Sequence, residues 1–296
     1  MNGVNLRKLI GVLACLFIFL FTIQCNQAPD VGGIKWVKVN GGVFKMGSDE
    51  GWSEEKPIHD VRLDTYYISK YEVTVGQYMA FVEETQSHHP EWQKIGSKFH
   101  LQGGASDYYR KLGESLTGSD SPIVGVSWHD AVSFCEWLSK KTGQNIHLPS
   151  EAQWEFAARG GISTRNYEYS GGVYPKDVAW YKENSIKTIH SVGKKAPNEL
   201  GIYDMSGNVS EWCHDWFYRS YYREGTGAEP VYNPQGPIKG SNRVIRGGSW
   251  NYPAHDCRVA FRRSKHPGVK DNYLGFRLCL SPGGEFKKEI SRNEKD

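Results

Sequence analysis

The stretch RVIRGGSW at residues 243–250 decides the fold, and a polar loop links it to RVAFRR at 258–263 and GFRLCL at 275–280. Val244 and Ile245 are β-branched and run into a Gly-Gly break, which indicates a strand that meets a tight turn or a close backbone approach. In the two later segments apolar residues alternate with arginines. This period of two predicts half-buried strands with cationic outer faces.

Upstream of this stretch, three capping boxes predict the starts of three helices. Each has a serine or threonine three residues before a residue that can return a hydrogen bond: Thr74 with Gln77, Ser127 with Asp130, and Ser150 with Gln153. Apolar residues at i, i+3, i+4 and i+7 follow the second box. They include Cys135, so we expect this thiol to face a core.

The other segments give weaker signals. Residues 34–45 read as two strands joined by a hairpin turn at Asn40-Gly41-Gly42, and residues 61–68 as one alternating strand. Residues 87–122 are polar and poorly periodic, which predicts a long surface insertion in which His88 and His89 are solvated.

Composition argues against a disordered chain and against a nucleic-acid-binding protein. The chain has 296 residues, of which 39% are hydrophobic and 13% aromatic, together with 33 glycines; this is typical of a loop-rich globular protein. Without Arg7 and Lys8 the 36 basic residues become 34, against 33 acidic ones, a net charge of +1. We therefore expect no nucleic-acid partner.

The N-terminus has the pattern of an export signal. Arg7 and Lys8 precede an apolar run at residues 9–23, which suits a signal-peptide core better than a spanning helix. Cys25 follows directly, so we expect lipidation there and a membrane-anchored lipoprotein of the cell envelope. Cleavage before Cys15, a plain secretory leader and a short anchor remain alternatives.

Several blocks, in order, resemble the formylglycine-generating enzyme (sulfatase-modifying factor) family. Besides RGGSW and GFR they are FKMG at 44–47, EVT at 72–74, VSWHDA at 126–131, LPSEAQWEFAARGG at 148–161 and GIYDMSGNVSEW at 201–212. The resemblance implies an α+β, C-type-lectin-like fold with little regular secondary structure, an irregular antiparallel sheet and a few helices. We expect a signal peptide at 1–24, a tether at 25–33, one domain at 34–281 and a disordered tail at 282–296.

The resemblance raises the question of an oxidase site. Active members of the family hold copper(I) with two cysteines, five apart, after Gly-Gly-Ser, and use oxygen to convert a substrate cysteine to formylglycine. Cys257 matches the second cysteine, but Tyr252 stands at the first position. A phenol cannot replace a thiolate for this soft ion, which argues against copper. Cys257 is then a lone reactive thiol, a structural or disulfide-bonded thiol, or inert; Ser249 is a further catalytic candidate.

Four cysteines are expected to remain after export: Cys135, Cys213, Cys257 and Cys279. Four cysteines allow three full pairings. The resemblance implies a bond from Cys135 to a cysteine directly after Gly-Phe-Arg, but Leu278 stands there and Cys279 comes one residue later. Such a slip turns a strand side chain to the opposite face. Cys135–Cys279 remains the favoured pair, with Cys213–Cys257 as its complement.

The resemblance also implies a structural calcium ion. Asp204 and Glu211 would supply carboxylates, and Gly207 and Val209 backbone carbonyls, a mixed oxygen set that suits this hard ion. The alternative is a tight turn with capping carboxylates. A second calcium site is only partly matched, because Asn184 and Ile186 fit it while Trp180 replaces a side-chain amide.

Three hypotheses for function follow. The first is an envelope-anchored family member that lacks the copper site and acts as a binding or accessory module, with a peptide, a glycan or an envelope protein in its loop groove. The second is an active formylglycine-generating oxidase for exported sulfatases. The third is another oxidation, at Cys257 or Tyr252, with a different metal.

Overall fold

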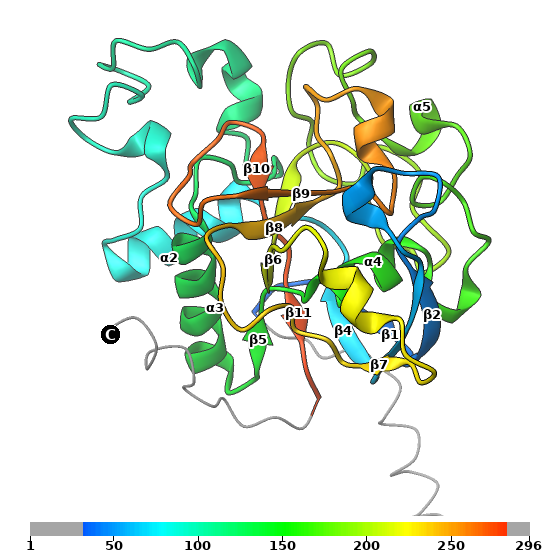
Figure 1. Ribbon diagram of the computed structural model, residues 1–296. Helices are drawn as coiled ribbons and strands as arrows, with labels where there is room; N and C mark the ends of the chain where they lie inside the picture. Colours follow the sequence, from blue (N-terminus) through cyan, green and yellow to red (C-terminus); the bar gives the residue numbers. More distant parts are fainter. Residues whose placement is uncertain (1–31, 283–296) are drawn as a thin grey trace, which may run out of the picture.

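The computed structural model describes residues 32–282 (Figure 1). The predicted signal peptide, the lipidation site at Cys25 and most of the predicted tail lie outside these residues. Among the described helices, none is long and apolar enough to cross a membrane. The α-helices are α2 (Val75–Thr85), α3 (Trp128–Thr142), α4 (Glu151–Ala158) and α5 (Pro175–Val178).

Short 3-10 turns punctuate the long loops. They are η1 (Ser53–Glu55), η2 (Glu91–Gln93), η3 (Arg110–Leu116), η4 (Gly161–Ser163), η5 (Tyr221–Gly225) and η6 (Ala254–Cys257).

Three small sheets replace the single irregular antiparallel sheet that we expected. The first has the order β1 (Trp36–Val39), β4 (Tyr66–Ser69), β11 (Cys279–Leu280), β5 (Ile146–His147). The second has the order β10 (Leu274–Gly275), β6 (Ser210–Trp216), β8 (Arg243–Arg246), β9 (Arg262–Lys265). The third has the order β2 (Gly42–Met46), β3 (His59–Leu63), β7 (Val231–Tyr232). The β10–β6 and β3–β7 pairs are parallel, and the other pairs are antiparallel.

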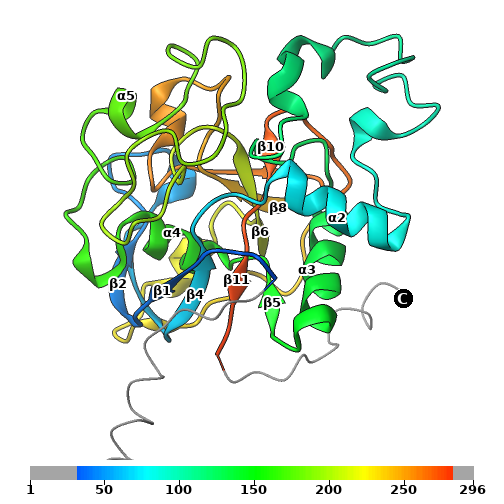
Figure 2. The same ribbon diagram turned by 180° about the vertical axis from the view of Figure 1, so that it is seen from behind.

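The helices begin where the sequence predicted. Thr74, Ser127 and Ser150 each accept a hydrogen bond from the backbone three residues on, and the capping box closes in all three. Cys135 is buried on α3, as its spacing predicted. In Figures 1 and 2, α2 and α3 lie on one side of β6 and β11, and α4 lies on the other.

The predicted hairpin at residues 34–45 is wrong, and residues 61–68 are not one strand. β1 pairs with β4, whereas β2 pairs with β3 in another sheet. The cause is a contact between two chain corners. Gly41 donates its backbone N–H to Thr65 Oγ1 (3.0 Å), and a Cβ on Gly41 would lie 2.5 Å from the Leu63 carbonyl oxygen. The chain therefore passes from one sheet to the other between β1 and β2, and it passes back between β3 and β4.

The segment at residues 87–122 is more than a surface insertion. Trp92, Tyr109, Leu112 and Leu116 are buried in the larger hydrophobic core. Trp92 Nε1 donates to the Val124 carbonyl (2.9 Å), which fixes the segment to the body of the domain.

Candidate functional site

The Gly-Gly break after β8 lets two loops meet. Gly247 and Gly248 have φ angles of 94° and 70°, in the region that favours glycine. A Cβ on Gly248 would lie 2.6 Å from Cys257 Sγ, so the second glycine makes room for the cysteine loop. Ser249 is buried and donates to Asn251 Oδ1 (2.6 Å), which places its hydroxyl in a local turn.

Cys257 lies in the interior, at the end of η6. It is fully buried in a small cluster with Tyr169 and Val178. Burial, helped by the charge of Asp256, raises the pKa of its thiol to about 12. The thiol is therefore protonated at neutral pH, and the expectation of a reactive thiolate has no support in this geometry.

Tyr252, where the resemblance implied a cysteine, packs in a different place from Cys257. Its ring lies 5.2 Å from that of Tyr273, and the guanidinium of Arg263 lies 4.6 Å from its centre. Tyr252 belongs with the larger core, whereas Cys257 belongs with the small cluster.

The two predicted disulfides are absent: Cys135, Cys213, Cys257 and Cys279 are all free and buried. Cys135 and Leu278 belong to the larger core, but Cys279 belongs to the second core, with Cys213. The one-residue slip after Gly-Phe-Arg has turned Cys279 to the opposite face of its strand. Cys213 and Cys257 likewise lie in different clusters.

The arginines predicted on outer strand faces are largely inside. Arg246, Arg262 and Arg277 are almost wholly buried. Each pairs with a glutamate from a distant segment, whose carboxylate compensates the buried charge. The expectation of cationic outer faces is therefore wrong for Arg262 and Arg277.

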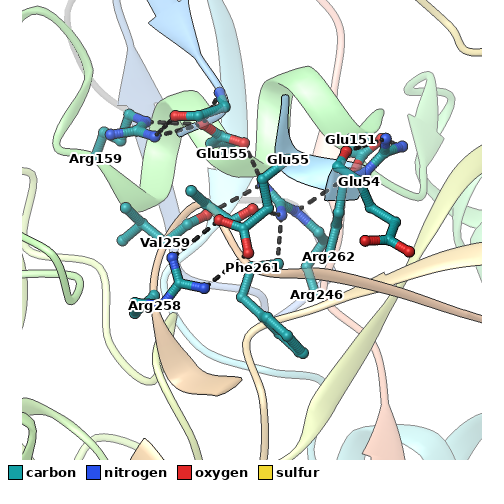
Figure 3. Close-up of polar contacts among 12 residues, drawn as sticks. Glu54, Glu55, Glu151, Glu155, Arg159, Arg246, Arg258, Val259, Phe261 and Arg262 are labelled. Atoms are coloured by element: carbon teal, nitrogen blue, oxygen red, sulfur yellow. Dashed lines mark hydrogen bonds and ion pairs between the residues drawn. The ribbon is translucent and has the colours of Figure 1, made fainter. Parts of the chain in front are cut away.

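Four arginines and three glutamates form one network beneath the cysteine loop (Figure 3). Its ion pairs are Arg258 Nη2 to Glu55 Oε1 (2.7 Å), Arg262 Nη2 to Glu151 Oε2 (2.6 Å), Arg159 Nη2 to Glu155 Oε1 (2.7 Å), and Arg246 Nη2 to Glu155 Oε2. Two further contacts join these pairs: Arg246 Nε lies 3.7 Å from Glu151 Oε1, and Arg262 Nη1 donates to the carbonyl of Glu54, next to Glu55 (3.1 Å). Burial alone would raise the pKa of Glu155, but the charges of Arg159 and Arg246 hold this pKa below its usual value. We call this set the Arg–Glu network; it joins the N-terminal loop, α4, β8 and β9.

Sequence reasoning missed the glutamates of this network. Glu151 and Glu155 are spaced i, i+4 on a short helix whose other residues, apart from Gln153, are apolar. That spacing, beside a C-terminal segment rich in arginines, is the signal that could have found them.

Two open hollows flank the cysteine loop and share Trp52 and His255 as walls. One, of about 850 Å³, is lined by Asp49, Glu50 and Glu168 among others. The other, of about 730 Å³, is lined by Tyr252 and by residues 261–265 among others. Neither is lined by Cys257 or Ser249, so the two catalytic candidates do not face these hollows.

The predicted calcium residues fit an ion only in part. Arg277 donates to both oxygens of Glu211 (2.6 and 2.7 Å), and Trp154 Nε1 donates to Oε2 (2.7 Å), so this carboxylate is already engaged. Asp204 accepts from the Gly193 N–H (2.7 Å), and burial raises its pKa to about 6. Glu72 also lies in this cluster, where burial and then the charge of Asp204 raise its pKa.

Of these three buried carboxylates, only Glu211 accepts hydrogen bonds from the Arg277 guanidinium. Yet within residues 32–282 no group of three or more His, Cys, Asp or Glu side chains is arranged to hold a metal ion. Calcium at Asp204, Gly207, Val209 and Glu211 stays a prediction.

The residues of the second predicted calcium site make local contacts. Asn184 Oδ1 accepts from the Tyr181 N–H (2.8 Å), and Asn184 Nδ2 donates to the Ala179 carbonyl (2.9 Å). Trp180 stacks on His190 at 3.7 Å, and Ile186 is exposed.

Comparison with known proteins agrees with the sequence blocks. The profile of the family described as "Sulfatase-modifying factor enzyme 1-like domain" matches residues 25–282. The formylglycine-generating enzyme of Streptomyces coelicolor is 34% identical over 289 residues, covering 82% of this chain and 88% of that protein. The serine/threonine-protein kinase pkn1 of Chlamydia pneumoniae is 35% identical over 246 residues, covering 82% of this chain. The chain spans only 37% of that kinase.

A solved structure supports the same conclusion about the fold. Treponema denticola variable protein 1 superimposes with a TM-score of 0.66 at 28% identity, covering 83% of this chain and 95% of the other. The expected α+β, C-type-lectin-like fold is confirmed.

Proposed function

Because the chain belongs to the formylglycine-generating enzyme (sulfatase-modifying factor) family, we propose that it acts as an envelope-anchored binding or accessory module of that family. The proposal sets it apart from the family's copper-dependent oxidases. The observation that carries it is the place of Cys257, which is fully buried in a cluster that contains no second thiol. Burial also raises the pKa of this thiol.

Copper(I) does not fit the residues present. The ion prefers soft thiolate ligands, and two of them are needed to hold it while a substrate thiolate approaches. The other described cysteines belong to the two larger cores, and none of them is a member of the Cys257 cluster. We therefore derive no oxidation step through copper.

Binding is supported by the surface beside the former oxidase position. The two hollows have aromatic, acidic and basic walls, and Trp52 at their junction is 57% exposed. Exposed aromatic side chains with charged neighbours are typical of recognition surfaces. The rigid Arg–Glu network beneath them would keep the binding loops in position.

Family membership by itself does not specify the oxidase. The relatives bear names as different as formylglycine-generating enzyme, serine/threonine-protein kinase and variable protein. The anchoring part of the proposal rests on the leader and Cys25 in the sequence.

Copper(I) competition titration tests the proposal. The mature chain should bind copper(I) no more tightly than a Cys257→Ser variant, because a buried protonated thiol is a poor ligand. Tight binding that depends on Cys257 would contradict the proposal. A Tyr252→Cys variant is the matched comparison for a restored cysteine pair: it shows whether the loop can move Cys257 into a ligand position.

A further inference from the structure

The second four-stranded sheet ends in an open edge. In the order β10-β6-β8-β9, the last strand pairs only with β8. Among the described residues, no segment other than β8 makes a backbone hydrogen bond to residues 263–265. Since alternate residues of an antiparallel strand direct their N–H and C=O groups away from the neighbour, this edge offers unpaired donors and acceptors.

This edge faces a cleft. All of residues 261–265 line the hollow of about 730 Å³, whose other walls include Trp52, Phe217 and Tyr252. Four residues of extended chain span about 13 Å, so the edge can pair with a peptide of four to six residues. The cleft thus combines an unpaired strand edge with aromatic walls.

The charge of the edge selects the occupant. Arg263 and Lys265 alternate on one face of β9, with side chains 47% and 33% exposed. The side chains of their carboxylate partners, Asp256 and Asp271, are more buried, with only 6% and 18% of their surface exposed. Glu54, the other acidic wall residue, pairs with Arg219 at 3.0 Å. The charge presented to solvent along the strand is therefore positive.

We infer that β9 captures an acidic, extended peptide of a partner protein, which adds as a fifth strand to the sheet. The inference rests on the proposed binding role and names its ligand class. Backbone hydrogen bonds would provide affinity, and carboxylates opposite Arg263 and Lys265 would provide selectivity. The same two cations protect the edge from unwanted pairing, because they repel basic strands and disfavour apolar ones.

The test uses the mature chain and the peptide Ac-Glu-Val-Glu-Val-Glu-Val-NH₂ with a fluorescent label. It should bind, and its lysine-valine counterpart should not. Two N-methylated versions separate strand addition from simple charge attraction. Methylation of alternate amides in one register should abolish binding, whereas methylation in the other should leave it intact, because only one set of N–H groups faces β9. Equal binding of both versions, or of the lysine peptide, would overturn the inference, as would no binding of the acidic peptide.

Variants locate the site. Arg263→Glu and Lys265→Glu should together weaken binding roughly tenfold or more, because attractive cross-strand pairs become repulsive. Arg62→Glu is the matched control, since Arg62 is an exposed residue on β3, which has strands on both sides. Melting temperatures check that all variants are folded. Equal weakening by the control would contradict the assignment to β9. Peptide binding and copper binding are separate readouts, so failure of one does not imply failure of the other.

Discussion

Arg246 illustrates how single residues stabilise this interior. Its guanidinium contacts Glu155 and donates to three backbone carbonyls, those of Val259, Ala260 and Phe261. A buried cation requires such compensation, because an unpaired charge in the core is strongly destabilising. The contacts also fix the chain between the cysteine loop and β9.

Glu155→Gln should lower the free energy of unfolding by about 3–5 kcal/mol, because it leaves Arg246 and Arg159 without their shared carboxylate. Urea denaturation measures the change. Glu84→Gln, which removes the exposed pair with Lys141, is the control and should change stability little. A loss at Glu155 no larger than at Glu84 would contradict the importance of the Arg–Glu network.

Asp215 should make stability depend on pH. Burial, followed by the charge of Glu151, raises its pKa from 3.8 to about 7. The folded state therefore retains a proton that the unfolded state loses, and this contribution to stability is present below pH 3.8 and lost as pH rises through about 7. Asp215→Asn should flatten the curve of unfolding free energy against pH in that window. Identical curves for the two proteins would contradict the shift.

The thiols provide a third test at this scale. Iodoacetamide should not modify the folded domain, because all four described cysteines are buried and burial raises their pKa values. In denaturant without reductant, mass spectrometry should find all four modified. Two modified cysteines would instead reveal one disulfide, and none would reveal two.

At the scale of elements, local signals were predictable and long-range ones were not. The starts of α2, α3 and α4 depend on side chains three residues apart, and the sequence predicted all three. The change of sheet at Gly41 depends on a contact with Thr65, 24 residues away. The burial of Arg262 depends on Glu151, 111 residues away. Alternation alone could not reveal these partners.

The predicted calcium site, in the loop before β6 and at the start of that strand, can be tested by thermal melting. If the oxygens of Asp204, Gly207, Val209 and Glu211 hold an ion, millimolar calcium should raise the melting temperature relative to chelator, and Asp204→Ala should abolish the rise. Binding to the folded state alone adds about 2.7 kcal/mol at one hundred times the dissociation constant. An unchanged melting temperature would count against the calcium site.

For the whole molecule, the family and the fold could be predicted from sequence, but the positions of Cys257 and of the free strand edge could not. The family and its C-type-lectin-like fold could be inferred from ordered blocks. The place of Cys257 could not, because its burial arises from packing against Tyr169 and Val178, far along the chain. The open edge of β9 likewise depends on strand order.

The most direct test of the account is whether the mature chain converts a sulfatase-type cysteine peptide to formylglycine. Peptide, copper and oxygen are supplied, and mass spectrometry detects the aldehyde. We expect no conversion above that of a Cys257→Ser variant, because a tyrosine stands at position 252 and Cys257 is buried. Robust, Cys257-dependent aldehyde formation would contradict it and establish an oxidase that functions without the cysteine pair.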